Sequence, residues 1–303
     1  MKNLIYLLLA MPLLFASCSN DYTSFEGEEV QVSFCAEIPV TRAAAALTVD
    51  TVVCAVFENG NEIDKLRKEI SIEDGEDIVF APRLIKGRTY NIVFWAMKGD
   101  SYNVTDLTKI SRNDNATATE ADYDAFTKSV EVTVNNSVSL PVTLTRPLAQ
   151  LNVAISEADW NAAADLFGMT PTTTEIKVSK RTFCALCGEP EYTGQGEYTT
   201  YTLPASGNTV TVNGTDYMSI ASCYVFATNE SESHIIDITT VKDQNDNDII
   251  RKDVTIPAVS IPAVTLQSNY KTNVVGSILT GKVSYTISIS DTFANEEHKK
   301  EIE

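Results

Sequence analysis

Near its C-terminus the chain reads YKTNVVGSILT at residues 270–280 and VSYTISI at residues 283–289. The second stretch alternates strictly between apolar and polar side chains, and successive side chains of a β-strand point to opposite faces of the sheet. The alternation therefore predicts a strand with one buried face. Its apolar positions are Val283, Tyr285, Ile287 and Ile289.

The same period of two recurs along the chain, for example at residues 30–38 and 138–144. Only two segments are predicted to be helical: residues 157–167, which Ser156 could cap, and residues 120–128, which Thr119 could cap. Short strands between turn-forming clusters are typical of β-sandwiches. We therefore expect an all-β chain with one or two short helices.

Two sandwich domains are expected, because the chain is longer than one domain of common size. Pro147 interrupts an otherwise continuous strand pattern, which favours a boundary at this point. The prediction is an N-terminal domain at residues 30–146 and a C-terminal domain at residues 147–291. The segment at residues 292–303 is a charged tail.

The first 17 residues have the parts of an export signal: Lys2 supplies a positive charge, residues 4–15 are apolar, and Ala16 and Ser17 are small. The apolar run is shorter than the roughly 20 residues of a membrane-spanning helix, which favours a cleaved signal peptide. Cys18 follows at the position where lipoproteins are acylated, for example with palmitate. We expect a lipoprotein tethered through residues 18–29, with ordinary secretion as the alternative.

Acidic residues outnumber basic ones by 41 to 23, and the formal net charge is −18. Such a surface repels phosphate, so nonspecific binding of nucleic acid is not expected.

The chain has six cysteines, and those other than Cys18 are odd in number, so at least one is free or paired between chains. They are Cys35, Cys54, Cys184, Cys187 and Cys223. Cys184 and Cys187 have the spacing of a redox or zinc pair, but no second cysteine pair and no βαβ pattern accompanies them. We expect a structural pair or unmodified thiols there, and no metal.

The two histidines, His234 and His298, lie in no recognisable catalytic motif, so no enzyme activity, catalytic residue or cofactor is expected. Residues 243–248 have calcium-loop spacing at their start only, which favours a turn. Trp95 and Trp160 lie among apolar neighbours and are predicted to be core residues.

The C-terminal stretch at residues 270–289 resembles the signature of the fimbrillins of Bacteroidetes, the Mfa-like and FimA-like lipoprotein subunits of type V pili. Four other parts of the chain support this resemblance. They are the signal ending at Cys18, the first strand running into Thr41-Arg42-Ala43, and two segments that read YNIVFWA at residues 90–96 and RPLAQLNV at residues 146–153.

The resemblance implies two transthyretin-like, Greek-key sandwiches and a structural role in a cell-surface fimbria that supports adhesion. It further implies assembly by donor-strand exchange. A trypsin-like protease would cut between Arg42 and Ala43, and the first strand would leave with its lipid anchor in the cell outer membrane. A C-terminal strand of another copy, or of a related fimbrial subunit, would then replace it.

The departing strand would carry Val30, Val32, Phe34 and Ile38, and the candidate donor strand would carry Val283, Tyr285, Ile287 and Ile289. The alternative function is a surface lipoprotein that binds carbohydrate as part of a glycan-uptake system. Such a module would need exposed aromatic side chains.

Overall fold

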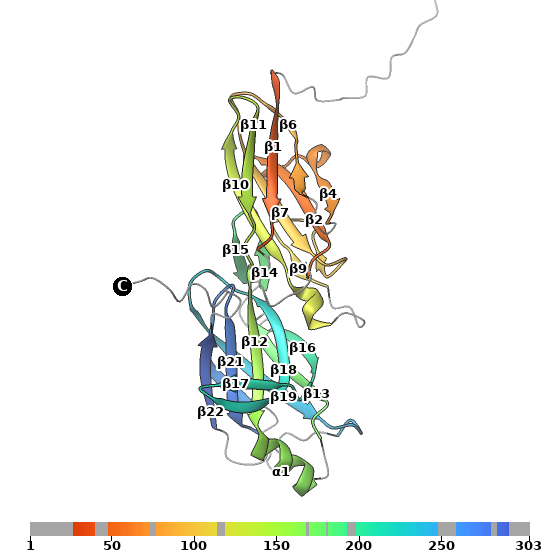
Figure 1. Ribbon diagram of the computed structural model, residues 1–303, viewed down its shortest axis with the longest axis vertical. Helices are drawn as coiled ribbons and strands as arrows, with labels where there is room; N and C mark the ends of the chain where they lie inside the picture. Colours follow the sequence, from red (N-terminus) through yellow and green to blue (C-terminus); the bar gives the residue numbers. More distant parts are fainter. Residues whose placement is uncertain are drawn as a thin grey trace, which may run out of the picture.

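The computed structural model describes residues 27–39, 48–72, 77–113, 119–167, 170–179, 181–192, 198–247, 259–279 and 284–290. Two β-sandwiches lie one above the other along the long axis of the molecule (Figure 1). The predicted signal peptide, Cys18, Arg42, Ala43 and Val283 lie outside the described residues. Within those ranges no helix is long and apolar enough to cross a membrane.

The first sandwich consists of two sheets. In one sheet the strand order is β11-β1-β5, with β6 also paired to β1; in the other it is β10-β7-β2-β3, with β4 also paired to β2. The strands are β1 (Glu29–Glu37), β2 (Thr51–Glu58), β3 (Asn61–Glu62), β4 (Lys68–Ser71), β5 (Ile78–Phe80), β6 (Arg83–Ile85), β7 (Thr89–Met97), β10 (Phe126–Thr133) and β11 (Val138–Thr143).

The second sandwich pairs a sheet of order β17-β18-β12-β21-β22 with one of order β16-β13-β19-β20. Its strands are β12 (Leu148–Ser156), β13 (Thr173–Ser179), β16 (Tyr198–Pro204), β17 (Thr209–Val212), β18 (Thr215–Phe226), β19 (Glu232–Lys242), β20 (Val259–Leu266), β21 (Lys271–Ser277) and β22 (Ser284–Ser290). The predicted all-β architecture with two sandwiches is confirmed. The domain limits at residues 30, 146 and 291 stay predictions.

Two short hairpins lie between the sandwiches, one formed by β8 (Tyr102–Asn103) and β9 (Ser111–Arg112), the other by β14 (Arg181–Cys184) and β15 (Glu189–Tyr192). The helical segments are the 3-10 helices η1 (Asp64–Leu66) and η2 (Glu120–Tyr123) and the α-helix α1 (Glu157–Phe167).

Helix α1 has the predicted bounds, and the Ser156 hydroxyl caps it by accepting the Asp159 N–H at 3.1 Å. The helix predicted at residues 120–128 is wrong. Only η2 forms there, and β10 begins at Phe126 and pairs with β7. The alternating half-buried side chains of β10, including Val130 and Val132, fit a strand face, and tertiary pairing overrides the local helix signal.

Strands β2 and β7 are buried on both faces, which explains why they read as continuous apolar runs rather than as alternating ones. One face, with Cys54 and Phe94, packs into the core of the first sandwich. The opposite face, with Val53 and Trp95, packs into a second apolar cluster together with Phe226 of the other sandwich. The sheet therefore belongs to both the first core and the junction.

Trp95 is the centre of this junction and is fully buried, as predicted for a core residue. Its ring lies 5.3 Å from Tyr102, 5.6 Å from Phe183 and 6.2 Å from Phe226, measured between centroids. Trp160 is half-buried against the core of the second sandwich. The edge-to-face and tilted contacts of Trp95 stabilise the junction beyond the contribution from burying the rings.

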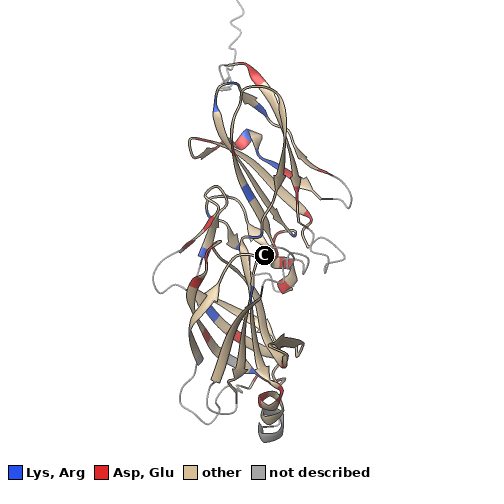
Figure 2. Ribbon diagram, turned by 60° about the vertical axis from the view of Figure 1, so that its left-hand side comes forward, with Lys and Arg blue, Asp and Glu red and all other residues tan. Residues whose placement is uncertain are grey.

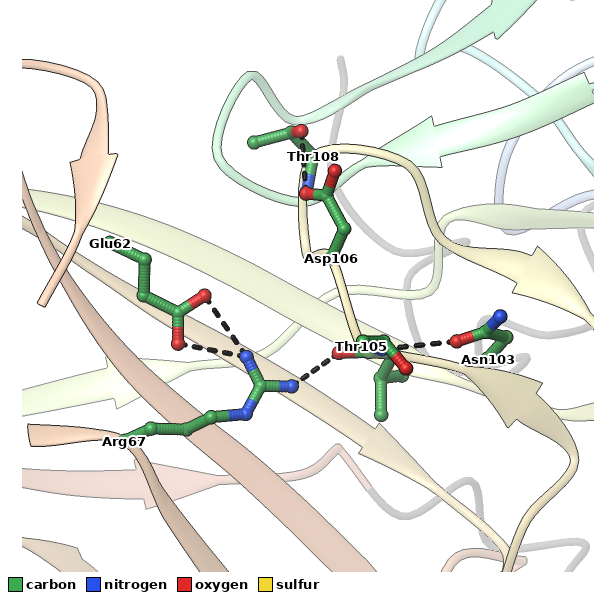
Figure 3. Close-up of polar contacts among 7 residues, drawn as sticks. Glu62, Arg67, Asn103, Thr105, Asp106 and Thr108 are labelled. Atoms are coloured by element: carbon green, nitrogen blue, oxygen red, sulfur yellow. Dashed lines mark hydrogen bonds and ion pairs between the residues drawn. The ribbon is translucent and has the colours of Figure 1, made fainter. Parts of the chain in front are cut away.

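The β14–β15 hairpin extends the second sandwich onto the first. Ile110 and Phe183 exchange two backbone hydrogen bonds, of 2.8 and 2.9 Å, and the Ala185 N–H donates to the Leu107 carbonyl at 2.8 Å. Figure 3 shows how the receiving loop is held: the Arg67 guanidinium binds Glu62 at 2.8 Å and donates to the Val104 carbonyl. Arg67 thereby anchors the loop that the hairpin contacts.

A buried ion pair at the end of the first sandwich also contacts the second one. The Arg146 guanidinium donates to both carboxylate oxygens of Asp124, at 2.6 and 2.8 Å, and to the side-chain oxygen of Asn269 at 3.0 Å. The side chains of Arg146 and Asp124 are only 7% and 2% exposed. Arg146 thus links the end of the first sandwich to the turn before β21.

Replacing Arg146 with Met should destabilise the protein, because it leaves the Asp124 carboxylate buried without its cation. We expect a loss of about 3–5 kcal/mol in the free energy of unfolding, measured by urea denaturation. The control is Lys86→Met, which removes an exposed ion pair with Glu28 and should cost less than about 1 kcal/mol. Equal effects of the two substitutions would contradict this account of the junction.

Candidate functional site

The strand predicted to depart, β1, lies in the middle of its sheet (Figure 1). On one side it runs parallel to β11, in register from Val32↔Val138 to Glu37↔Thr143. On the other side it runs antiparallel to β5 and β6, with Phe34 opposite Phe80. Both backbone edges of β1 are therefore hydrogen-bonded, and its removal would expose open edges on the neighbouring strands.

One face of β1 is apolar and buried. Val32 and Phe34 are fully buried, Ala36 and Ile38 are each 8% exposed, and Val30 packs at the rim of the same core. Each buried Val, Phe or Ile side chain contributes about 1.5–3 kcal/mol, so this face contributes an amount comparable with the whole stability of a domain. The seat of β1, defined as the surface of β11, β5, β6 and the facing sheet that β1 covers, is thus an apolar groove.

Aromatic contacts fix the middle of the seat. The Phe34 ring meets Phe94 edge-on at 6.1 Å between centroids, and Phe80 meets the same ring at 6.2 Å and an interplanar angle of 90°. The polar contact near the start of β1, between Lys86 and Glu28, is exposed and contributes little. Burial rather than charge therefore holds β1 in place.

The candidate donor strand β22 lies at the edge of the second sandwich and pairs, among the described strands, only with β21. Tyr285 and Ile287 are half-buried against the second core, and Ile289 is 43% exposed. Gly276 allows the two strands to approach, since a Cβ atom there would lie 2.7 Å from the Tyr285 Cα.

Strand β21 is held much more firmly than β22. It lies between β12 and β22, with Thr272 fully buried and Val274 2% exposed. After it, the backbone N–H groups of Ile278 and Leu279 both donate to one carboxylate oxygen of Asp159 at 2.8 Å.

The predicted departing and donor strands lie in different sandwiches of the same chain, so the structure does not bring them together (Figure 1). The roles assigned to both strands stay predictions, as do the lipidation of Cys18 and the cut between Arg42 and Ala43.

Among the described residues, Cys184, Cys187 and Glu191 lie close enough together to offer ligands to one metal ion. Cys184 and Cys187 form a disulfide in the turn of the β14–β15 hairpin. Cys54 and Cys223 are buried thiols, and burial raises the pKa of both, that of Cys54 to about 12, which keeps them protonated. Cys35 is half-buried on the outer face of β1, 3.6 Å from the Ser139 hydroxyl.

The turn predicted at residues 243–248 is present as far as it is described. The Asp243 carboxylate accepts the backbone N–H groups of Asn245 and Asn247, each at 2.8 Å, and Asp246 has a φ of 63°. Aspartate side chains commonly stabilise turns by accepting hydrogen bonds from backbone N–H groups of the turn.

A pocket of about 280 Å³ opens at the junction of the sandwiches, and the sequence analysis missed it. Its lining includes Arg112, Arg181, Tyr102, Tyr198, Tyr201 and Tyr224. Each arginine is engaged by a carboxylate, Arg112 by Glu120 at 2.6 Å and Arg181 by Glu232 at 2.7 Å. Residues this far apart in the chain have no local pattern that could reveal the pocket.

The charge around this pocket is balanced. Arg112 stacks 3.4 Å above the Tyr123 ring, and Arg181 lies beside His234. Burial, together with the positive charge of Arg181, lowers the pKa of His234 to about 4, so this histidine is neutral at neutral pH. In Figure 2 the basic residues, coloured blue on the ribbon, lie at separate positions along both sandwiches.

The family model described as a family of unknown function, DUF6562, matches residues 23–303. No curated protein matches the chain. Among solved structures, a proposed adhesin from Bacteroides ovatus has 14% identity and a TM-score of 0.47, with 88% of this chain and 98% of that chain covered.

The fimbrial anchor protein Mfa2 from Porphyromonas gingivalis is another similar structure. It has 11% identity and a TM-score of 0.44, with 87% of this chain and 98% of that chain covered. At these values the likeness carries no functional conclusion.

Truncating Phe34 to Ala should destabilise the first sandwich, because it removes the ring from a fully buried position. The expected loss is about 3–5 kcal/mol in the free energy of unfolding. Gln31→Ala is the control on the exposed face of the same strand and should change stability by no more than about 0.5 kcal/mol. A small effect of Phe34→Ala in urea unfolding would show that the seat does not depend on β1.

Proposed function

We propose that this chain, which belongs to the family of unknown function DUF6562, is a structural subunit of a cell-surface fimbria that supports adhesion. The observation that carries the proposal is the position of β1. The first described strand of the chain lies at the centre of a sheet and contributes a large part of one core. A subunit built in this way can exchange that strand for one from another chain.

In this proposal the precursor is exported by the signal at residues 1–17 and acylated at Cys18, which anchors it in the cell outer membrane. Arg42 lies in the connection between the end of β1 at Glu37 and the start of β2 at Thr51. It is the single basic residue between Lys2 and Lys65, so a trypsin-like protease would cut this connection selectively.

Cleavage would leave β1 bound only by its noncovalent contacts. Its departure would open the edges of β11 and β5 above an apolar groove, which is the usual acceptor for strand addition. A strand from another copy of the chain, or from a related subunit, would fill the seat. Strand β22 is the candidate donor of this chain, because an edge strand leaves with the least disruption of its own sandwich.

Blocking the cut should stop assembly without unfolding the subunit. In the variant Arg42→Ala, we expect folded monomers that keep a lipidated N-terminus at Cys18, because β1 stays covalently attached in its seat. The measurements are mass spectrometry of the N-terminal peptide and gel analysis of surface polymers, with Lys65→Ala as a matched control. Polymers of normal length from Arg42→Ala would overturn the proposed cleavage.

Carbohydrate binding is the second candidate, and the pocket at the junction favours it. Tyr198 lies at the pocket and is 47% exposed, so a sugar ring could stack on its face. A glycan array with the mature protein tests this function. Binding that is lost in Tyr198→Ala would support it, whereas an array without signal would exclude this pocket as a sugar site.

A further inference from the structure

We infer that the seat of β1 is filled by a strand from a different protein, because the movable strand of this chain does not fit its own seat. The inference rests on the proposed function. The seat receives side chains at four alternate positions of the strand, which Val32, Phe34, Ala36 and Ile38 occupy.

The third position accepts only a small side chain. Ala36 lies between Val142 of β11 and Ile78 of β5 in the register of the sheet. Both neighbours are buried, with exposures of 3% and 6%, so they leave Ala36 itself only 8% exposed. Close-packed interiors resist added methylene groups, because neighbouring side chains must leave their preferred rotamers.

The second position accepts an aromatic ring without a polar group. Phe34 is fully buried, meets Phe94 edge-on and lies opposite Phe80 and Leu140 on the two neighbouring strands. A phenolic hydroxyl in these surroundings would be desolvated among apolar side chains.

Strand β22 violates both requirements. When its alternate positions are aligned with those of β1, Val283 and Ile289 match Val32 and Ile38, but Tyr285 takes the place of Phe34 and Ile287 the place of Ala36. A shift by two residues in either direction still puts Tyr285 or Ile289 at the position of Ala36. No register that places one of the residues 283, 285, 287 or 289 at the position of Ala36 gives a small residue there.

Strand β21 fits the small position but is not free to move. In the equivalent alignment Gly276 takes the place of Ala36 and Ile278 that of Ile38. However, β21 is a central strand of the second sandwich, and Asp159 binds the segment that follows it. Its removal would take apart the core of its own domain.

The partner is therefore a chain that donates a strand parallel to β11, with an aromatic residue, then Ala or Gly, then a β-branched residue at successive inward positions. Apart from β1 itself, which in the proposed function leaves with the lipid anchor, the described strands of a second copy include no edge strand with this pattern. The chain accordingly joins a fimbria of mixed composition rather than a polymer of itself.

Substitutions in the intact chain test the fit of the seat without any assembly. The double variant Phe34→Tyr with Ala36→Ile gives β1 the inward residues of β22. We expect its folding equilibrium constant, from urea unfolding, to fall by at least about 10-fold. Gln31→Ile, which adds the same side chain to the exposed face of the strand, is the control. A double variant as stable as the original chain would overturn the inference.

Exchange with synthetic peptides separates the inference from the proposed function. The full chain, cut by trypsin between β1 and β2, is mixed with a peptide of residues 28–39, one of residues 282–290, or the second peptide carrying Tyr285→Phe and Ile287→Ala. The first and third should displace β1, and the second should do so at least about 10-fold less well. If no peptide displaces β1, the proposed function fails. If the second equals the first, only the inference fails.

Discussion

The burial of one face of β1 is the interaction on which the first sandwich depends. Val32, Phe34 and Ile38 lie in a core that also contains Phe80 and Phe94, from strands on both sheets. Because β1 is the first of the described strands but lies at the centre of its sheet, β11 has to pair with it at the end of the domain. The first sandwich is complete only when its first strand, β1, lies beside its last strand, β11.

The core under β1 is connected to the second sandwich through the sheet that contains β2 and β7. Strands β2 and β7 present alternate residues to the core under β1 and to the junction. Phe94 therefore packs into the core under β1, and the next residue, Trp95, packs into the junction. A change in the seat of β1 therefore acts on the sheet that carries the junction. Arg146 and the β14–β15 hairpin hold that junction from the other side, through Asp124, Asn269 and the Ile110–Phe183 backbone pair.

Alternation of apolar residues was enough to predict the strands with one solvated face, such as β1 and β22, because a period of two leaves little choice of structure. It was misleading where local signals compete: Thr119 and the acidic residues after it resemble a helix start, yet pairing with β7 makes a strand from Phe126. The junction could not be predicted in this way. Arg146, Asp124 and Asn269 carry no mutual spacing pattern, and only the folded chain brings them within hydrogen-bond distance.

The central claim is that a foreign strand replaces β1 in the assembled fimbria. Cryo-electron microscopy of fimbriae sheared from the native organism tests it most directly, since side-chain density identifies the strand beside β11. The account predicts a strand parallel to β11 from a different protein, with an aromatic residue in the place of Phe34 and a small one in the place of Ala36. Density for β1 itself in every copy of this subunit would contradict it.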